Sequence, residues 1–121
     1  MLRKQQEKVM ALIASYPKVF RDSFAEWLPD NLHVFEEFCE KADRLWDRGR
    51  RHYSSRTIGE VIRFETDVAE DSEEGFKLNN NWTPDLGRLY VLLHPDRYHL
   101  FKYRRKPVQL SIAVQLLKSK K

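Results

Sequence analysis

The sequence has few of the residues that mark particular classes of protein. Its 121 residues include one cysteine, Cys39, so no disulfide can form within the chain, and a reducing compartment, by default the cytoplasm, is predicted. Its four glycines are spread singly, which excludes a glycine-rich phosphate-binding loop. No apolar run approaches the roughly 20 residues that cross a bilayer, so we expect no membrane partner.

The residues that usually build catalytic or metal sites are also sparse. The histidines are scattered, at positions 33, 52, 94 and 99, and no cysteine pair accompanies them, so no zinc-binding spacing exists. Ser54 and Ser55 have no evident activating base and are interpreted as helix caps. We therefore expect no enzyme, no metal and no cofactor.

Charge is present in quantity but unevenly distributed. The net charge is +4, yet five arginines crowd residues 44–56, and an acidic stretch runs from Glu65 to Glu74. After Asp96 there is no acid, while eight lysines and arginines follow. A surface of one sign attracts polyanions such as nucleic acid, or an acidic protein face, although a solvated basic tail that binds nothing is an equal alternative.

Apolar spacing predicts a mostly helical chain. We expect helices over residues 2–15, 31–48, 83–94 and 107–118. A further helix is capped by Ser54 or Ser55, and its expected apolar face is Ile58, Val61 and Ile62, with Phe64 as a further candidate. The residues expected to be buried in the last two helices are Leu86, Leu89, Tyr90 and Leu93, and Leu110, Ala113, Val114 and Leu117. Gly49 suits the position after a helix end. Phe76–Leu78 and residues 98–106 are expected to be strands, because aromatic residues alternate in the second segment.

This order of elements predicts the fold class: mainly α with a small β-hairpin (α+β), a winged-helix-like core with extra N- and C-terminal helices. The expected division is an N-terminal helical extension over 1–30, a core over 31–106 and a C-terminal basic helix or tail over 107–121, within a single domain. Such a fold would present the start of its third helix to DNA.

Three consecutive asparagines precede that helix. Asparagine amides can pair with adenine, and arginine with guanine or phosphate, but asparagine also suits a turn. Trp82 is interpreted as packing onto the helix in preference to stacking on a base, and Arg88 is expected to face solvent. The predicted surface for nucleic acid or another partner consists of Asn79, Asn80, Asn81, Trp82, Arg88, Arg56, Lys102, Arg104, Arg105 and Lys106.

Residues 50–105 resemble a family of small uncharacterised phage and prophage proteins. The shared pattern is tyrosine-serine-x-arginine, isoleucine-arginine-x-glutamate-threonine, phenylalanine-lysine-isoleucine/leucine-asparagine-asparagine-asparagine and histidine-proline. The matching residues here are Tyr53, Ser54, Arg56, Arg63, Glu65, Thr66, Phe76, Lys77, Asn79, Asn80, Asn81, His94 and Pro95. The resemblance implies a phage or prophage origin and no particular activity. Gly59 and Gly87 depart from the bulkier residues expected there.

Three functions follow as hypotheses, the third being a structural or assembly protein whose extra terminal helices make an oligomer interface. The first is a regulatory protein that binds double-stranded DNA, with a homodimer matching a palindromic site. The second is a phage-encoded inhibitor of a host defence protein, such as a CRISPR–Cas protein. In that case an acidic surface made by Glu70, Asp71, Glu73 and Glu74 would imitate the phosphate backbone.

Overall fold

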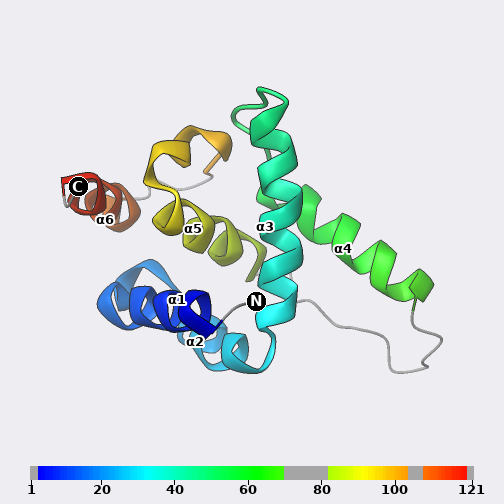
Figure 1. Ribbon diagram of the computed structural model, residues 1–121, viewed down its shortest axis with the longest axis horizontal. Helices are drawn as coiled ribbons and strands as arrows, with labels where there is room; N and C mark the ends of the chain where they lie inside the picture. Colours follow the sequence, from blue (N-terminus) through cyan, green and yellow to red (C-terminus); the bar gives the residue numbers. More distant parts are fainter. Residues whose placement is uncertain (1–2, 70–81, 104–107, 120–121) are drawn as a thin grey trace.

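The computed structural model describes residues 3–69, 82–103 and 108–119, and almost all of them lie in helices (Figure 1). The α-helices are α1 (Arg3–Ser15), α2 (Asp22–Trp27), α3 (Leu32–Asp47), α4 (Ser55–Ala69), α5 (Thr83–Leu93) and α6 (Val108–Ser119). Among the described residues, the 3-10 helices η1 (Pro17–Val19), η2 (Leu28–Asp30) and η4 (Pro95–Leu100) connect some of them.

The predicted fold class is wrong, because the described residues contain no strand and the fold is all-α. The segment expected to be the second strand begins instead as η4, and beyond it only an isolated parallel bridge joins Phe101 to Tyr53. Aromatic residues favour a strand through packing against neighbouring strands. Here Phe101 packs against Phe38 and Tyr90 of two helices, so the winged-helix interpretation does not hold. The first expected strand, residues 76–78, lies outside the described residues.

The long helix α3 ends as the sequence predicts. Gly49 adopts a φ of 79°, a left-handed conformation that glycine enters without a steric cost. The N–H of Gly49 donates to the Trp46 carbonyl at 2.9 Å, and the N–H of Arg50 donates to the Leu45 carbonyl at 3.0 Å. This paired arrangement satisfies the last carbonyls of the helix. It also turns the arginine-rich segment sharply out of α3.

The helix α5 lies at the centre of the molecule and packs against α1, α3, α4 and α6 (Figure 1). Of the residues predicted to be buried, Leu86, Leu89 and Tyr90 are fully buried, as expected from their spacing, and Leu93 is half-buried. Val91 and Leu92, on other sides of the helix, are buried too. The helix therefore contributes to the core on nearly all sides.

Gly87 allows α4 to approach α5 closely. A Cβ at this position would lie 3.2 Å from the Ser55 Cβ and 3.6 Å from the Phe101 ring. The first turn of α4 and the residue after η4 therefore meet at the same side of α5. This contact explains a glycine where the resemblance led us to expect a larger residue.

The helix α4 differs from prediction in its apolar face. Ile58 and Ile62 are buried, but Val61 is 42% exposed and Phe64 is 69% exposed. The second half of α4 extends away from α3 and α5 (Figure 1). The apolar face that we expected on α4 was therefore too wide, because the prediction assumed that other helices cover α4 along its whole length.

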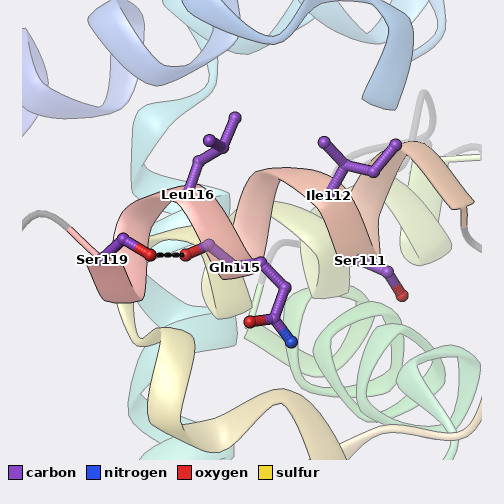
Figure 2. Close-up of a pocket in the computed structure, with 5 residues that line it drawn as sticks. All are labelled: Ser111, Ile112, Gln115, Leu116 and Ser119. Carbon is purple, nitrogen blue, oxygen red and sulfur yellow. Dashed lines mark hydrogen bonds between the residues drawn. The ribbon is translucent and has the colours of Figure 1, made fainter.

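One hydrophobic core joins the outer helices to the central ones. It includes Val9 and Leu12 of α1, Phe38 of α3, and Leu110 and Val114 of α6. On α6 the predicted inward residues Leu110, Ala113 and Val114 are buried and Leu117 is half-buried. Ile112 and Leu116 are half exposed (Figure 2). None of the described helices has the length and apolar character that crossing a bilayer requires.

Candidate functional site

Much of the predicted binding surface lies outside the described residues. This applies to the asparagines at 79–81, to the basic residues at 104–106 and to the acidic residues Glu70, Asp71, Glu73 and Glu74. The structure places four of the predicted residues, Arg56, Trp82, Arg88 and Lys102.

Trp82 packs against another tryptophan at the start of α5. Its ring stacks on that of Trp27 with the centroids 4.6 Å apart, and its Nε1–H donates to the Ser23 hydroxyl at 3.1 Å. The residue thus ties the start of α5 to α2. This packing agrees with the interpretation of Trp82 as a contact between helices.

We expected Arg88 to face solvent. Instead, it forms an ion pair with a buried carboxylate. Its Nη1 lies 2.8 Å from Oδ1 of Asp85, a side chain with no exposed surface. Burial raises the pKa of Asp85, and the guanidinium of Arg88 and the nearby Arg21 oppose that shift. Because this carboxylate is enclosed and paired, it does not present a negative charge at the surface.

Arg56 lies on the exposed side of the first turn of α4. Its Nε is 3.5 Å from Glu60 one turn later, so part of its charge is balanced locally. Glu65 of the same helix lies 2.8 Å from the Lys41 ammonium of α3. The charge of Arg56 is therefore partly neutralised by its own helix.

Lys102 is brought beside the arginine-rich turn by main-chain hydrogen bonds. The N–H groups of His52 and Tyr53 donate to the carbonyls of His99 and Leu100 at 2.9 and 2.7 Å. The N–H of Lys102 donates back to the Tyr53 carbonyl at 2.8 Å. Two segments nearly fifty residues apart in the sequence are thus fixed side by side.

The result is a surface that we name the arginine surface. Its members are exposed cationic or titratable side chains from the turn after α3 and from the end of η4: Arg48, Arg50, Arg51, His52, His99 and Lys102. Neither segment 48–53 nor segment 97–102 contains an acidic residue. Within the described part of the chain, none of these six side chains forms an ion pair. Asp47, which is exposed and precedes Arg48, is the acid adjoining this turn in the sequence.

Aromatic rings hold two of these arginines. The Arg51 guanidinium lies 3.5 Å from the centre of the Trp46 ring, and that of Arg50 lies 5.9 Å from the centre of the Tyr53 ring. A guanidinium over a ring face can still use the N–H groups at its edge, and the attraction lowers the entropy that the side chain loses on binding. Arg51 Nη1 donates to the Arg50 carbonyl at 2.6 Å, which leaves the other N–H groups of that guanidinium for a ligand. The surface therefore combines charge with partial preorganisation.

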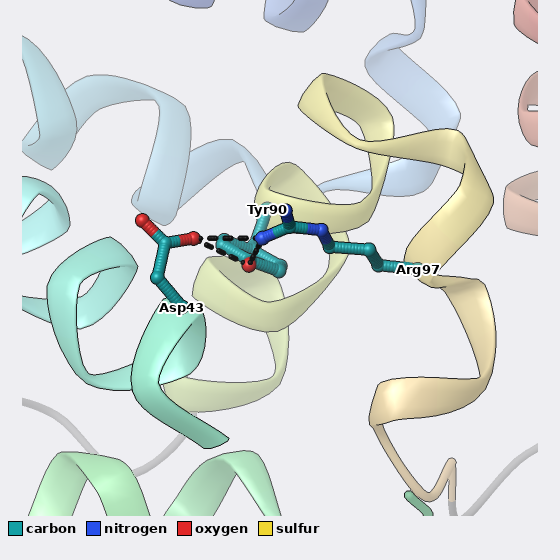
Figure 3. Close-up of polar contacts among 3 residues, drawn as sticks. All are labelled: Asp43, Tyr90 and Arg97. Atoms are coloured by element: carbon teal, nitrogen blue, oxygen red, sulfur yellow. Dashed lines mark hydrogen bonds and ion pairs between the residues drawn. The ribbon is translucent and has the colours of Figure 1, made fainter. Parts of the chain in front are cut away.

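A polar network links three of the elements around this surface (Figure 3). The Tyr90 hydroxyl donates to Asp43 at 2.7 Å, and Arg97 Nη1 donates to Asp43 at 2.9 Å and to the Tyr90 oxygen at 2.7 Å. Burial, then the hydrogen bond to Asp43, raises the pKa of Tyr90, so the hydroxyl keeps its proton. Arg97 also lies 5.3 Å from the Trp46 ring. The network ties α3, α5 and η4 together and balances the charge of Asp43.

The sequence predicted parts of the arginine surface and missed its assembly. The run of arginines and Lys102 were both identified, but His52 was considered only as a metal ligand. The missed signal is the left-handed conformation at His52, with a φ of 57°, which turns the chain so that Tyr53 pairs with the later segment. Such a conformation is uncommon outside glycine and is not visible in the composition.

The arrangement supports anion binding. Among residues 3–69, 82–103 and 108–119, no three His, Cys, Asp or Glu side chains are grouped as metal ligands.

Comparison of the chain with protein-family models, with curated proteins and with solved structures finds no match. The resemblance to phage proteins therefore stays a prediction.

Proposed function

We propose that this protein binds double-stranded DNA through the phosphate backbone, with the arginine surface as its binding site. The single observation that carries the proposal is the convergence of Arg48, Arg50, Arg51 and Lys102, all exposed and none ion-paired among the described residues. Unpaired cations attract phosphate without first breaking a salt bridge, and each contact releases condensed counterions from the DNA.

The stacked arginines suit phosphate in particular. A guanidinium offers its donors in a planar fork that matches two phosphate oxygens. The rings of Trp46 and Tyr53 hold two such forks above the surface. Contacts of this kind fix the position of a duplex but carry no sequence information. Binding by this surface is therefore expected to depend little on base sequence.

Fluorescence anisotropy of a labelled generic duplex, measured at several salt concentrations, tests the proposal. Each phosphate contact contributes roughly −0.9 to the slope of log K against log salt. The double variant Arg50→Gln/Lys102→Gln should flatten this slope by about 2 and weaken binding at low salt by roughly tenfold or more. Both side chains are exposed, so the fold should persist, as circular dichroism would show.

Arg44→Gln provides the matched control. Arg44 is an exposed arginine in α3. Its Nη2 lies 2.9 Å from Oε1 of Glu40, and it is outside the arginine surface. Its loss should change affinity little. A change in slope per removed charge that is as large in Arg44→Gln as in the double variant would indicate that only net charge matters, and this would contradict a defined site. No binding of the wild type at low salt would overturn the proposal and shift attention to a protein target, such as the host defence protein considered from the sequence.

A further inference from the structure

The outer side of α6 carries apolar residues that the fold leaves uncovered. Val108 is 57% exposed, and Ile112 and Leu116 are each 50% exposed. They recur every fourth residue and so form one stripe along the helix. We name these three residues the α6 stripe. Elsewhere in the described chain, the large apolar side chains with comparable exposure are Val61 and Phe64 of α4.

The stripe borders a shallow hollow. Ile112 and Leu116, with Ser111, Gln115 and Ser119, line a space of about 300 Å³ (Figure 2). The Ser119 hydroxyl donates to the Gln115 carbonyl of the same helix, at 2.9 Å, and so its donor is already satisfied. An exposed apolar strip of this kind can receive the side chains of a partner helix.

Charges at both ends of α6 indicate the kind of partner. Residues 107–117 contain no charged side chain, whereas residues 102–106 include four lysines and arginines, and Lys118, Lys120 and Lys121 follow. Two of the elements that pack against α6 carry exposed charged side chains: Lys18 in η1 and Asp96 in η4. The apolar stripe thus lies between two groups of positive charge in the sequence.

We propose that the α6 stripe binds an acidic amphipathic helix of another protein, with apolar residues against the stripe and carboxylates at both of its ends. A second copy of this chain fits less well, since parallel or antiparallel pairing of two α6 helices would bring groups of like charge together. An anionic bilayer fits less well because no exposed tryptophan, tyrosine or phenylalanine accompanies the stripe on α6.

Two synthetic helical peptides with the same leucine stripe test this inference, one with glutamate-rich ends and one with lysine-rich ends. Calorimetric titration of the full chain should detect binding of the glutamate peptide only. Ile112→Ser/Leu116→Ser should weaken that binding by roughly tenfold or more, because it removes the apolar contact and keeps the charges. Gln109→Ser, a change to another exposed residue of α6, should leave it within about twofold.

The same experiment separates this inference from the DNA proposal. Arg48→Gln/Arg50→Gln removes two charges of the arginine surface and none of those that flank α6 in the sequence, so it should reduce DNA binding and leave peptide binding nearly unchanged. Peptide binding that survives the serine substitutions would show attraction by charge alone and would overturn the inference. Absence of peptide binding would also overturn it, as would tighter binding to phosphatidylserine vesicles or a dimer that the serine substitutions dissociate.

Discussion

The helices α5 and α6 are similarly apolar in sequence but occupy opposite situations. In α5, Val91 has no exposed surface and Leu92 is 2% exposed, whereas in α6 Ile112 and Leu116 remain half exposed. The chain surrounds α5 with four other helices and covers α6 on one side. The apolar residues of a helix must be buried against another surface. The helix sequence does not show whether that surface belongs to the same chain or to a partner. This difference makes α5 the structural centre and α6 a candidate interface.

The largest expected effect comes from truncating the same residue type in both helices. Leu89→Ala in α5 should lower the free energy of unfolding by about 2–5 kcal/mol, because it leaves a cavity in a closed core. Leu116→Ala in α6 should change it by less than about 1 kcal/mol. Chemical denaturation of both variants gives the comparison, and similar losses would show that α6 is covered as fully as α5.

A smaller effect is expected where α4 crosses α5. Gly87→Leu should lower the free energy of unfolding by about 1–3 kcal/mol, since the new side chain would meet Ser55 and Phe101. Gly87→Ala should cost less, because alanine gains about 1 kcal/mol of helix propensity. Gln115→Leu on the exposed side of α6 is the control for the added leucine. If Gly87→Leu is as stable as the wild type, the close crossing is not a packing constraint.

The smallest effect concerns the buried carboxylate at the start of α5. The pKa of Asp85 is raised in the fold, so the folded chain retains this proton to a higher pH than the unfolded chain does. Its contribution to stability is largest below the ordinary value of 3.8 and is lost as the pH rises through the raised value. Asp85→Asn should therefore be at least as stable as the wild type at neutral pH, and its relative advantage should shrink in acid.

Denaturation of both proteins at several pH values measures this difference. The control is Asp30→Asn, because Asp30 is an exposed aspartate in η2. An advantage of Asp85→Asn that grew on acidification would contradict a raised pKa at Asp85. It would mean that the ion pair with Arg88 outweighs the cost of burial.

Local signals predicted the helices well and the strands wrongly. Gly49 and the apolar spacing of Leu86, Leu89 and Tyr90 act within a few residues, so their consequences could be read directly. The aromatic alternation around Phe101 could not, because whether it forms a strand depends on a neighbouring strand. The exposure of Phe64 depends similarly on where α3 stops covering α4.

The candidate site was predictable in composition but not in assembly. The arginines at 48–51 are adjacent in sequence, and their charge was evident. Their proximity to Lys102 depends on a tertiary contact, which one sequence does not reveal. The environment of Arg88 was misjudged for the same reason, since its partner Asp85 is buried only when α2 and α5 pack together.

The bridge between Tyr53 and Phe101 has a consequence for how this surface can change over evolution. The bonds that align its two segments run between main-chain N–H and carbonyl groups, and the side chains of His52, His99 and Lys102 take no part in them. A substitution at His99 or Lys102 can therefore alter charge or size without removing the bonds that align the segments. The fold thus provides a fixed platform on which selection can vary the ligand that is bound.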